Sequence, residues 1–157
     1  MSKITKNTQK KDFDINCDVI SLTFKDAGLI KTEILDNIEE KLTHQLVGAV
    51  VAEEKYQNGL THFHVWIKTH NKRKYTMKEL DSYGGCHGHY QPVRQTPLKN
   101  LAYVIKDNNY VSTKSSNLDA LIKQAIISYS YTNQKTFIEA ALRNDSLPPV
   151  NYKKKDE

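Results

Sequence analysis

The chain has 157 residues, of which 38% are hydrophobic and 26% charged, and its formal net charge is +5. This composition predicts one globular domain with its own core and excludes a disordered chain, while the positive charge is compatible with a polyanionic partner. The sequence has no long apolar run and no pattern of a secretory leader, so we expect no membrane partner and no secretion. Its two cysteines are too few for a disulfide framework.

The first part of the chain predicts a flexible basic arm, a strand and a helix. Residues 1–16 are polar and rich in lysine, which is typical of an arm. Residues 18–24 alternate between apolar and polar side chains, and this period of two predicts a strand with one face in the core. Isoleucine or leucine then recurs every four residues from Ile30 to Leu42, which predicts an amphipathic helix over residues 29–46.

The middle of the chain predicts a β-hairpin. An apolar run at 47–54 and an alternating run at 61–69 lie on either side of Asn58-Gly59. Asn-Gly between strand-like runs is the strongest local signal of a hairpin. A short helix is expected at 76–82, where Gly84-Gly85 ends it.

The last part of the chain predicts a strand followed by helices. Residues 87–95 are expected to form a strand that contains a proline, which places it at a sheet edge or a bulge. Thr96-Pro97 has the pattern of a helix N-cap and first residue, and that helix is expected to end near residue 107. Further helical patterns follow at 118–126 and 137–142.

The order of these elements predicts an α+β fold with a central antiparallel β-sheet flanked by helices. We expect one domain over residues 17–145, preceded by the arm and followed by a charged tail or linker at 146–157. The sequence contains no internal repeat and no sign of a second domain.

Two histidines in the predicted hairpin are candidate metal ligands. His62 and His64 alternate with Phe63, so their side chains project from one face of the strand, roughly 7 Å apart. With a carboxylate they would suit Mn²⁺ or Mg²⁺ and leave positions open for phosphate chemistry. The alternative is a pair of histidines on a solvated sheet face.

The carboxylate is expected from the other hairpin strand, which ends in Glu53-Glu54. A simple turn centred on Asn58-Gly59 would pair Glu53 with His64. A three-residue or bulged loop would shift the register by one residue and bring Glu54 to the histidine face. Periodicity leaves both alternatives open.

A tyrosine on the helix after Pro97 is a candidate nucleophile. Lys99, Tyr103 and Lys106 project opposite the apolar stripe, and the two ammonium groups would neutralise a phosphate and favour the phenolate. The alternative is an ordinary half-exposed surface tyrosine, one of nine in the chain. The stripe expected to be buried consists of Leu98, Leu101, Ala102 and Ile105.

Several other residues have chemistry that suits nucleic acid or metal. Trp66 shares the alternation of the histidines, so it either stacks on a base or packs in the core. Cys86-His87-Gly88-His89 lacks the four-ligand spacing of a structural zinc site, so a second metal is not expected there. The candidate DNA contacts, which solvated loops alone would also explain, are Lys72, Arg73, Lys74, Arg94 and Lys99.

In order and spacing, three segments resemble the N-terminal endonuclease domain of rolling-circle replication initiators (Rep proteins) of small circular single-stranded DNA viruses, geminivirus- or circovirus-like, and of related plasmids. Residues 20–24 match the first motif loosely and lack its paired asparagines, which puts the DNA contacts of that motif in doubt. Residues 62–67 fit the metal motif of histidine, hydrophobe, histidine. Residues 103–107 fit the third motif, with lysine three residues after tyrosine. The resemblance covers about residues 18–141.

The resemblance implies the HUH-endonuclease fold, which is RRM-like or palm-like, and nicking and joining of single-stranded origin DNA. It implies a metal, Mn²⁺ or Mg²⁺, held by Glu54, His62 and His64, with Glu54 selected by its spacing from His62. Tyr103 would form a 5′-phosphotyrosine link while Lys106 positions the phosphate or the ion. The implied substrate is a hairpin with a nonanucleotide-type loop, in the host nucleus if the protein is viral and otherwise inside the cell.

The helicase domain that often follows in such proteins has no counterpart in this sequence, and a homo-oligomer is possible when such a domain is joined. Two other functions remain open. One is a transposase or relaxase that uses a single tyrosine and the same histidine motif. The other is a basic nucleic-acid-binding module without catalysis.

Overall fold

The computed structural model describes residues 14–25 and 28–129, and the helical pattern expected at 137–142 lies outside these residues. Short 3₁₀ turns occur at Thr43–Gln45 and Tyr83–Gly85. The helices and strands are β1 (Ile15–Phe24), α2 (Lys31–Leu42), β2 (Leu46–Lys55), β3 (Thr61–Tyr75), α3 (Met77–Leu80), β4 (His89–Pro92), α4 (Pro97–Val104), β5 (Tyr110–Ser112) and α5 (Ser116–Tyr129).

The strands form one five-stranded sheet in the order β4-β1-β3-β2-β5, and every pair in it is antiparallel. This arrangement confirms the expected α+β fold with a central antiparallel sheet and flanking helices. The proline-containing strand β4 lies at an edge, as expected for a residue that cannot donate to the ladder. Strand β5 at the other edge was not predicted.

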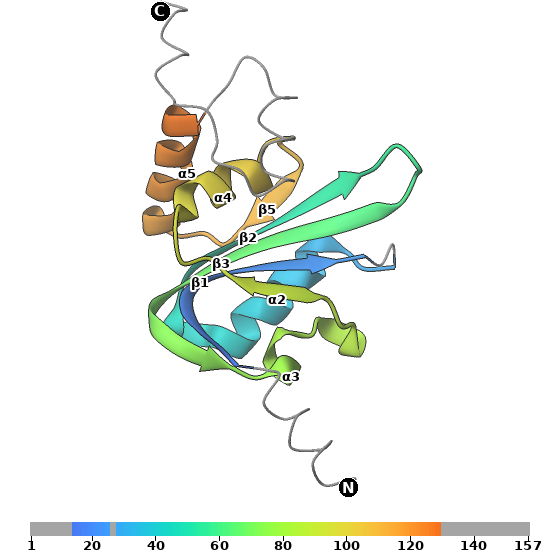
Figure 1. Ribbon diagram of the computed structural model, residues 1–157, viewed down its shortest axis with the longest axis horizontal. Coiled ribbons are helices and arrows are strands. Elements are labelled where there is room, and N and C mark those ends of the chain that lie inside the picture. The colour runs from blue at the N-terminus through green and yellow to red at the C-terminus, as the bar shows by residue number, and fades with distance from the viewer. Residues whose placement is uncertain (1–13, 26–27, 130–157) are drawn as a thin grey trace, which may run out of the picture.

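Helices cover both faces of the sheet (Figure 1). Helix α2 packs on one face, over a core that includes Ile20, Val51 and Phe63. Helices α4 and α5 pack on the other face and bury Val50 and Trp66. Because side chains alternate along a strand, neighbouring residues of β2 and β3 belong to different cores.

The boundaries differ from the expected ones mainly in the strands. Strand β1 begins at Ile15, inside the segment expected to be an arm, because residues 15–17 pair with the end of β3. Strand β3 continues to Tyr75, well beyond residue 69. Helix α4 begins at Pro97 as expected, but Thr96 is in the left-handed region with φ of 52° and makes no side-chain cap. The helix ends at Val104 rather than near residue 107.

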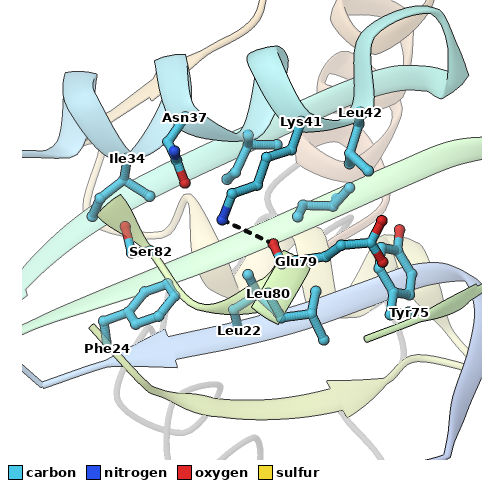
Figure 2. Close-up of a pocket in the computed structure, with 12 residues that line it drawn as sticks. Leu22, Phe24, Ile34, Asn37, Lys41, Leu42, Tyr75, Glu79, Leu80 and Ser82 are labelled. Carbon is cyan, nitrogen blue, oxygen red and sulfur yellow. Dashed lines mark hydrogen bonds between the residues drawn. The ribbon is translucent and has the colours of Figure 1, made fainter. Parts of the chain in front are cut away.

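A small cavity lies between α2 and the sheet, and Figure 2 shows the side chains around it. Its volume of about 10 Å³ holds about one water molecule. The Lys41 ammonium crosses its edge and donates to the main-chain oxygens of Glu79 at 3.2 Å and Asp81 at 2.5 Å, where α3 ends. The cavity is therefore part of the packing of α2. No helix within residues 14–25 and 28–129 is long and apolar enough to cross a membrane.

Candidate active site

The hairpin loop decides which glutamate faces the histidines. The Tyr56 N–H donates to the Leu60 oxygen and the Gly59 N–H donates to the Tyr56 oxygen, each at 2.9 Å. Gly59 has φ of +85°, a left-handed conformation that glycine adopts without strain. This is the three-residue type of loop, and its register pairs Glu54 with His62.

Glu53 points to the opposite face of the sheet. Its carboxylate lies 3.3 Å from the ammonium of Lys31, the first residue of α2. Both side chains are about one quarter exposed, at 26% and 25%. Glu53 therefore belongs to the α2 face and is separated from the histidines by the sheet itself.

Glu54 has two partners on the histidine face. Its Oε1 lies 2.9 Å from His64 Nε2, and its Oε2 lies 3.2 Å from the Lys106 ammonium. The His64 contact is the main reason that the pKa of Glu54 falls to about 2, and Lys106 lowers it further against the effect of burial. Glu54 therefore carries a negative charge at neutral pH.

His62 lies deeper than His64, with 7% of its surface exposed. Its Nδ1 is buried and has no hydrogen-bond partner among the described residues. Burial, followed by the neighbouring His64, lowers the pKa of His62. A neutral imidazole is the form that binds a metal ion. The centroids of the two imidazole rings lie 6.5 Å apart.

Helix α4 places Tyr103 above this cluster. The centroid of its ring lies 5.9 Å from that of His64, and the Lys106 ammonium lies 3.9 Å from the centre of the Tyr103 ring. Burial is the main cause of a raised pKa of Tyr103, and the Glu54 charge adds to it. The hydroxyl is therefore a neutral phenol at neutral pH.

The expected activation of Tyr103 by two lysines is not what the structure shows. The Lys106 side chain is only 3% exposed and is bonded to Glu54, so its charge is largely neutralised by that carboxylate. The Lys99 ammonium lies over the ring of Tyr129 at 5.9 Å. Both lysines thus have partners other than the phenol oxygen. Lys106 remains at the site, and Lys99 faces α5.

Tyr56 belongs to the site, although we did not predict it from the sequence. Its hydroxyl lies 3.4 Å from His64 Nε2, and its ring centroid lies 3.8 Å from that of His62. The alternation of β2 contained the signal, because residues two apart share a face, and Tyr56 follows Glu54 by two. The break in the strand pattern before Asn58-Gly59 obscured it.

These donors can be tested against a divalent metal ion. Among residues 14–25 and 28–129, no three His, Cys, Asp or Glu side chains are arranged to coordinate one ion. Glu54 and His64 contact each other instead. The donor set itself, one carboxylate and two imidazoles, suits a divalent ion with open positions. The unpartnered Nδ1 of buried His62 also fits a missing ligand. The residues fit an ion once the Glu54–His64 contact opens.

Trp66 is a packing residue. It is 1% exposed, and its Nε1 donates to the Pro97 oxygen at 3.2 Å. A side chain so buried has no free face for a base, so the stacking role considered above is wrong. Its hydrogen bond joins the histidine strand to the first residue of α4.

Most of the expected DNA contacts lie far from the histidines. Lys72 lies eight positions beyond His64 on β3, which corresponds to about 26 Å of strand. Arg73 is bonded to Glu79 at 2.5 Å, and Arg94 donates to the Asn16 oxygen at 3.1 Å. Lys74 pairs with Asn16 in the sheet, and Arg94 bonds to the same residue. Lys74 and Arg94 therefore share the end of the sheet opposite the hairpin loop.

The Cys86–His89 segment leads into β4. His87 Nδ1 lies 2.8 Å from Asp81 Oδ1, and the Tyr90 hydroxyl donates to the same oxygen at 2.5 Å. These bonds hold the segment to the turn after α3.

No protein-family model matches the chain, and no curated protein sequence does.

Proposed function

We propose that this chain nicks and rejoins single-stranded DNA through a covalent Tyr103 intermediate, with a divalent ion held by Glu54, His62 and His64. The observation that carries the proposal is the meeting of three separate segments at one place. Tyr103 of α4 lies 5.9 Å by ring centroids from His64 of β3, which contacts Glu54 of β2. A phenol beside a carboxylate and two imidazoles is a set suited to phosphoryl transfer.

The reaction exchanges one phosphate ester for another. The Tyr103 oxygen forms a bond to phosphorus and gives up its proton, while the bond to the 3′ oxygen breaks and that oxygen takes up a proton. The products are a 5′-phosphotyrosine and a free 3′-hydroxyl, and attack by such a hydroxyl reverses the step without ATP. A bound divalent ion would polarise the phosphate and stabilise its developing charge.

Lys106 has two tasks in this reaction. In the structure it neutralises Glu54 at 3.2 Å and lies 3.9 Å from the Tyr103 ring centre. If Glu54 held a divalent ion, the Lys106 ammonium would be available to a phosphate oxygen beside the phenol. Its positive charge would then favour loss of the phenol proton, which the charge of Glu54 opposes.

The biological setting follows from the resemblance to rolling-circle replication initiators. The order of the three motifs supports initiation of replication at a hairpin origin as the role of the nicking step. The basic end of the sheet, about 26 Å of strand from His64 to Lys72, suits duplex next to the nicked loop. Basic side chains there would contact its phosphates.

The test uses labelled hairpin oligonucleotides with randomised single-stranded loops, incubated with the protein and Mn²⁺ and separated on a denaturing gel. We expect a slowly migrating covalent adduct that EDTA abolishes, and mass spectrometry should place the modified peptide at Tyr103. Tyr103→Phe should lose the adduct, whereas the matched control Tyr110→Phe should keep it. Salt-sensitive retardation on native gels with no adduct in any pool would replace the nuclease by a binding module.

A further inference from the structure

Tyr56 contacts both imidazoles of the candidate site. Its ring meets that of His62 edge to face, with 3.8 Å between centroids and 73° between planes. Its hydroxyl lies 3.4 Å from Nε2 of His64. Resting on the proposed function, we propose that Tyr56 is a positioning residue that holds the two histidines in the orientation in which they take up the ion.

The ring contact fixes His62. The imidazole is 7% exposed, and its Nδ1 has no hydrogen-bond partner among the described residues. Hydrogen bonding at that nitrogen therefore does not determine how the ring is turned about its bond to Cβ. Close packing against the Tyr56 ring does, because rotation of the imidazole would drive it into the phenol.

The hydroxyl acts on His64. Nε2 of that ring has two neighbouring oxygens, Glu54 Oε1 at 2.9 Å and the Tyr56 hydroxyl at 3.4 Å. If Glu54 held the ion, the Tyr56 hydroxyl would remain beside Nε2 of His64. An outer hydrogen-bond partner orients a metal-binding histidine through the ring nitrogen that does not bind the ion, and its loss lowers metal affinity. With the Tyr56 hydroxyl at Nε2, the nitrogen of His64 that would take the ion is Nδ1.

The backbone of Tyr56 is held as firmly as its side chain. Its N–H donates to Leu60 and its oxygen accepts from Gly59, each at 2.9 Å, so both main-chain groups are used by the hairpin loop. The left-handed Gly59 keeps that loop short. The loop therefore sets where the phenol stands, and the phenol sets the imidazoles.

Two variants separate the two contacts. Tyr56→Phe keeps the ring on His62 and removes only the hydroxyl, whereas Tyr56→Leu removes both. Calorimetric titration with Mn²⁺ should show about a tenfold loss of affinity for Tyr56→Leu. The loss for Tyr56→Phe should be about threefold, in line with one weak hydrogen bond. The control Tyr83→Phe, in the 3₁₀ turn before β4, should bind Mn²⁺ as the unaltered protein does.

A second measurement needs neither metal nor DNA. In the ¹⁵N spectrum of the histidine side chains of the metal-free protein, Tyr56→Phe should shift the Nε2 resonance of His64 and leave that of His62 in place. Tyr56→Leu should shift both. This readout keeps the proposal testable if Tyr56→Leu fails to fold, because the phenylalanine variant retains the packing.

The outcomes distinguish this inference from the nuclease itself. Unchanged imidazole resonances in Tyr56→Phe, or Mn²⁺ affinity within twofold of normal in folded Tyr56→Leu, would overturn the role of Tyr56. Absence of a DNA adduct in the unaltered protein, with the resonance shifts present, would overturn the proposed function and leave Tyr56 as the organiser of a histidine pair.

Discussion

Glu53 and Glu54 are adjacent copies of the same side chain, yet the sheet gives them different surroundings. Glu53 meets Lys31 on the α2 face, where both partners are about one quarter exposed. Glu54 is 15% exposed and lies between His64 and a nearly buried Lys106 on the α4 face. The alternation of side chains along one strand therefore separates a partly exposed ion pair, Glu53 with Lys31, from the more buried cluster around Glu54. Matched substitutions on the two faces can measure how much this difference matters.

The largest effect should come from the core, on which both faces depend equally. Trp66→Ala on the α4 face and Phe63→Ala on the α2 face should each lower the free energy of unfolding by about 3–5 kcal/mol, because both rings are fully buried. Urea denaturation gives the values. A cost below about 1 kcal/mol for Trp66→Ala would mean that the α4 face is not a true core.

The lysines of the two faces should differ in cost. Lys106→Met leaves Glu54 with only His64 in a poorly solvated place, so we expect a loss of about 2–3 kcal/mol in unfolding free energy. Lys31→Met breaks the more exposed pair and should cost about 0–1 kcal/mol. Urea denaturation of both variants in EDTA measures the difference. Equal costs would contradict the burial of the Lys106 ion pair.

The glutamates should differ in metal binding. Glu54→Gln should weaken Mn²⁺ binding about tenfold or more, because it removes the charged oxygen ligand. Glu53→Gln alters the same type of residue one position away, beneath the sheet, and should leave affinity within about twofold. Calorimetry on both variants makes the comparison. Similar losses in the two would show that the hairpin register assigns the wrong glutamate.

A further effect should appear as a pH dependence of stability. The pKa of Glu54 is lowered from 4.5 to about 2, mainly by its bond to His64, so the folded state favours the charged form. The resulting stability is fully present above pH 4.5 and is lost as the pH falls towards 2. In EDTA, the stability difference between the unaltered protein and Glu54→Gln should therefore shrink over that range. A difference that stays constant from pH 6 to pH 3 would contradict the shift.

Much of the fold was predictable because its signals are local. Period two in β1 and β3, period four in α2, and Asn-Gly in the hairpin each reflect one element's own geometry. Strand β5 and the end of β3 were missed because they depend on partners that lie far away in the sequence. Residues 71–74 read Asn-Lys-Arg-Lys and resemble a solvated loop. The strand continues through them to Tyr75 because residues 15–17 of β1 pair with residues 73–75, and such a partner cannot be inferred from local pattern.

The candidate site was predictable only in part. Alternation placed His62 and His64 together but left Glu53 and Glu54 open, and only the resemblance favoured Glu54. The loop conformation that Gly59 adopts sets the register that brings Glu54 to the histidine face. The sequence predicted that Lys99 and Lys106 favour the phenolate of Tyr103, whereas burial and the Glu54 charge raise the pKa of Tyr103. Helix periodicity indicates on which side Lys106 begins, but it does not indicate that the Lys106 ammonium reaches Glu54. Long side chains select partners from other elements, so the charge balance at a site follows from tertiary packing.

The bond from Trp66 to Pro97 has a mechanical consequence. Trp66 lies two residues beyond His64 on β3, and Pro97 begins the helix that carries Tyr103. This bond ties the start of that helix to the histidine strand, so the helix cannot slide along the sheet without breaking it and uncovering the indole. Strand and helix are thus joined at the end of the helix furthest from Tyr103, and rotation about the bonds of the Tyr103 side chain can move its hydroxyl without disturbing that bond.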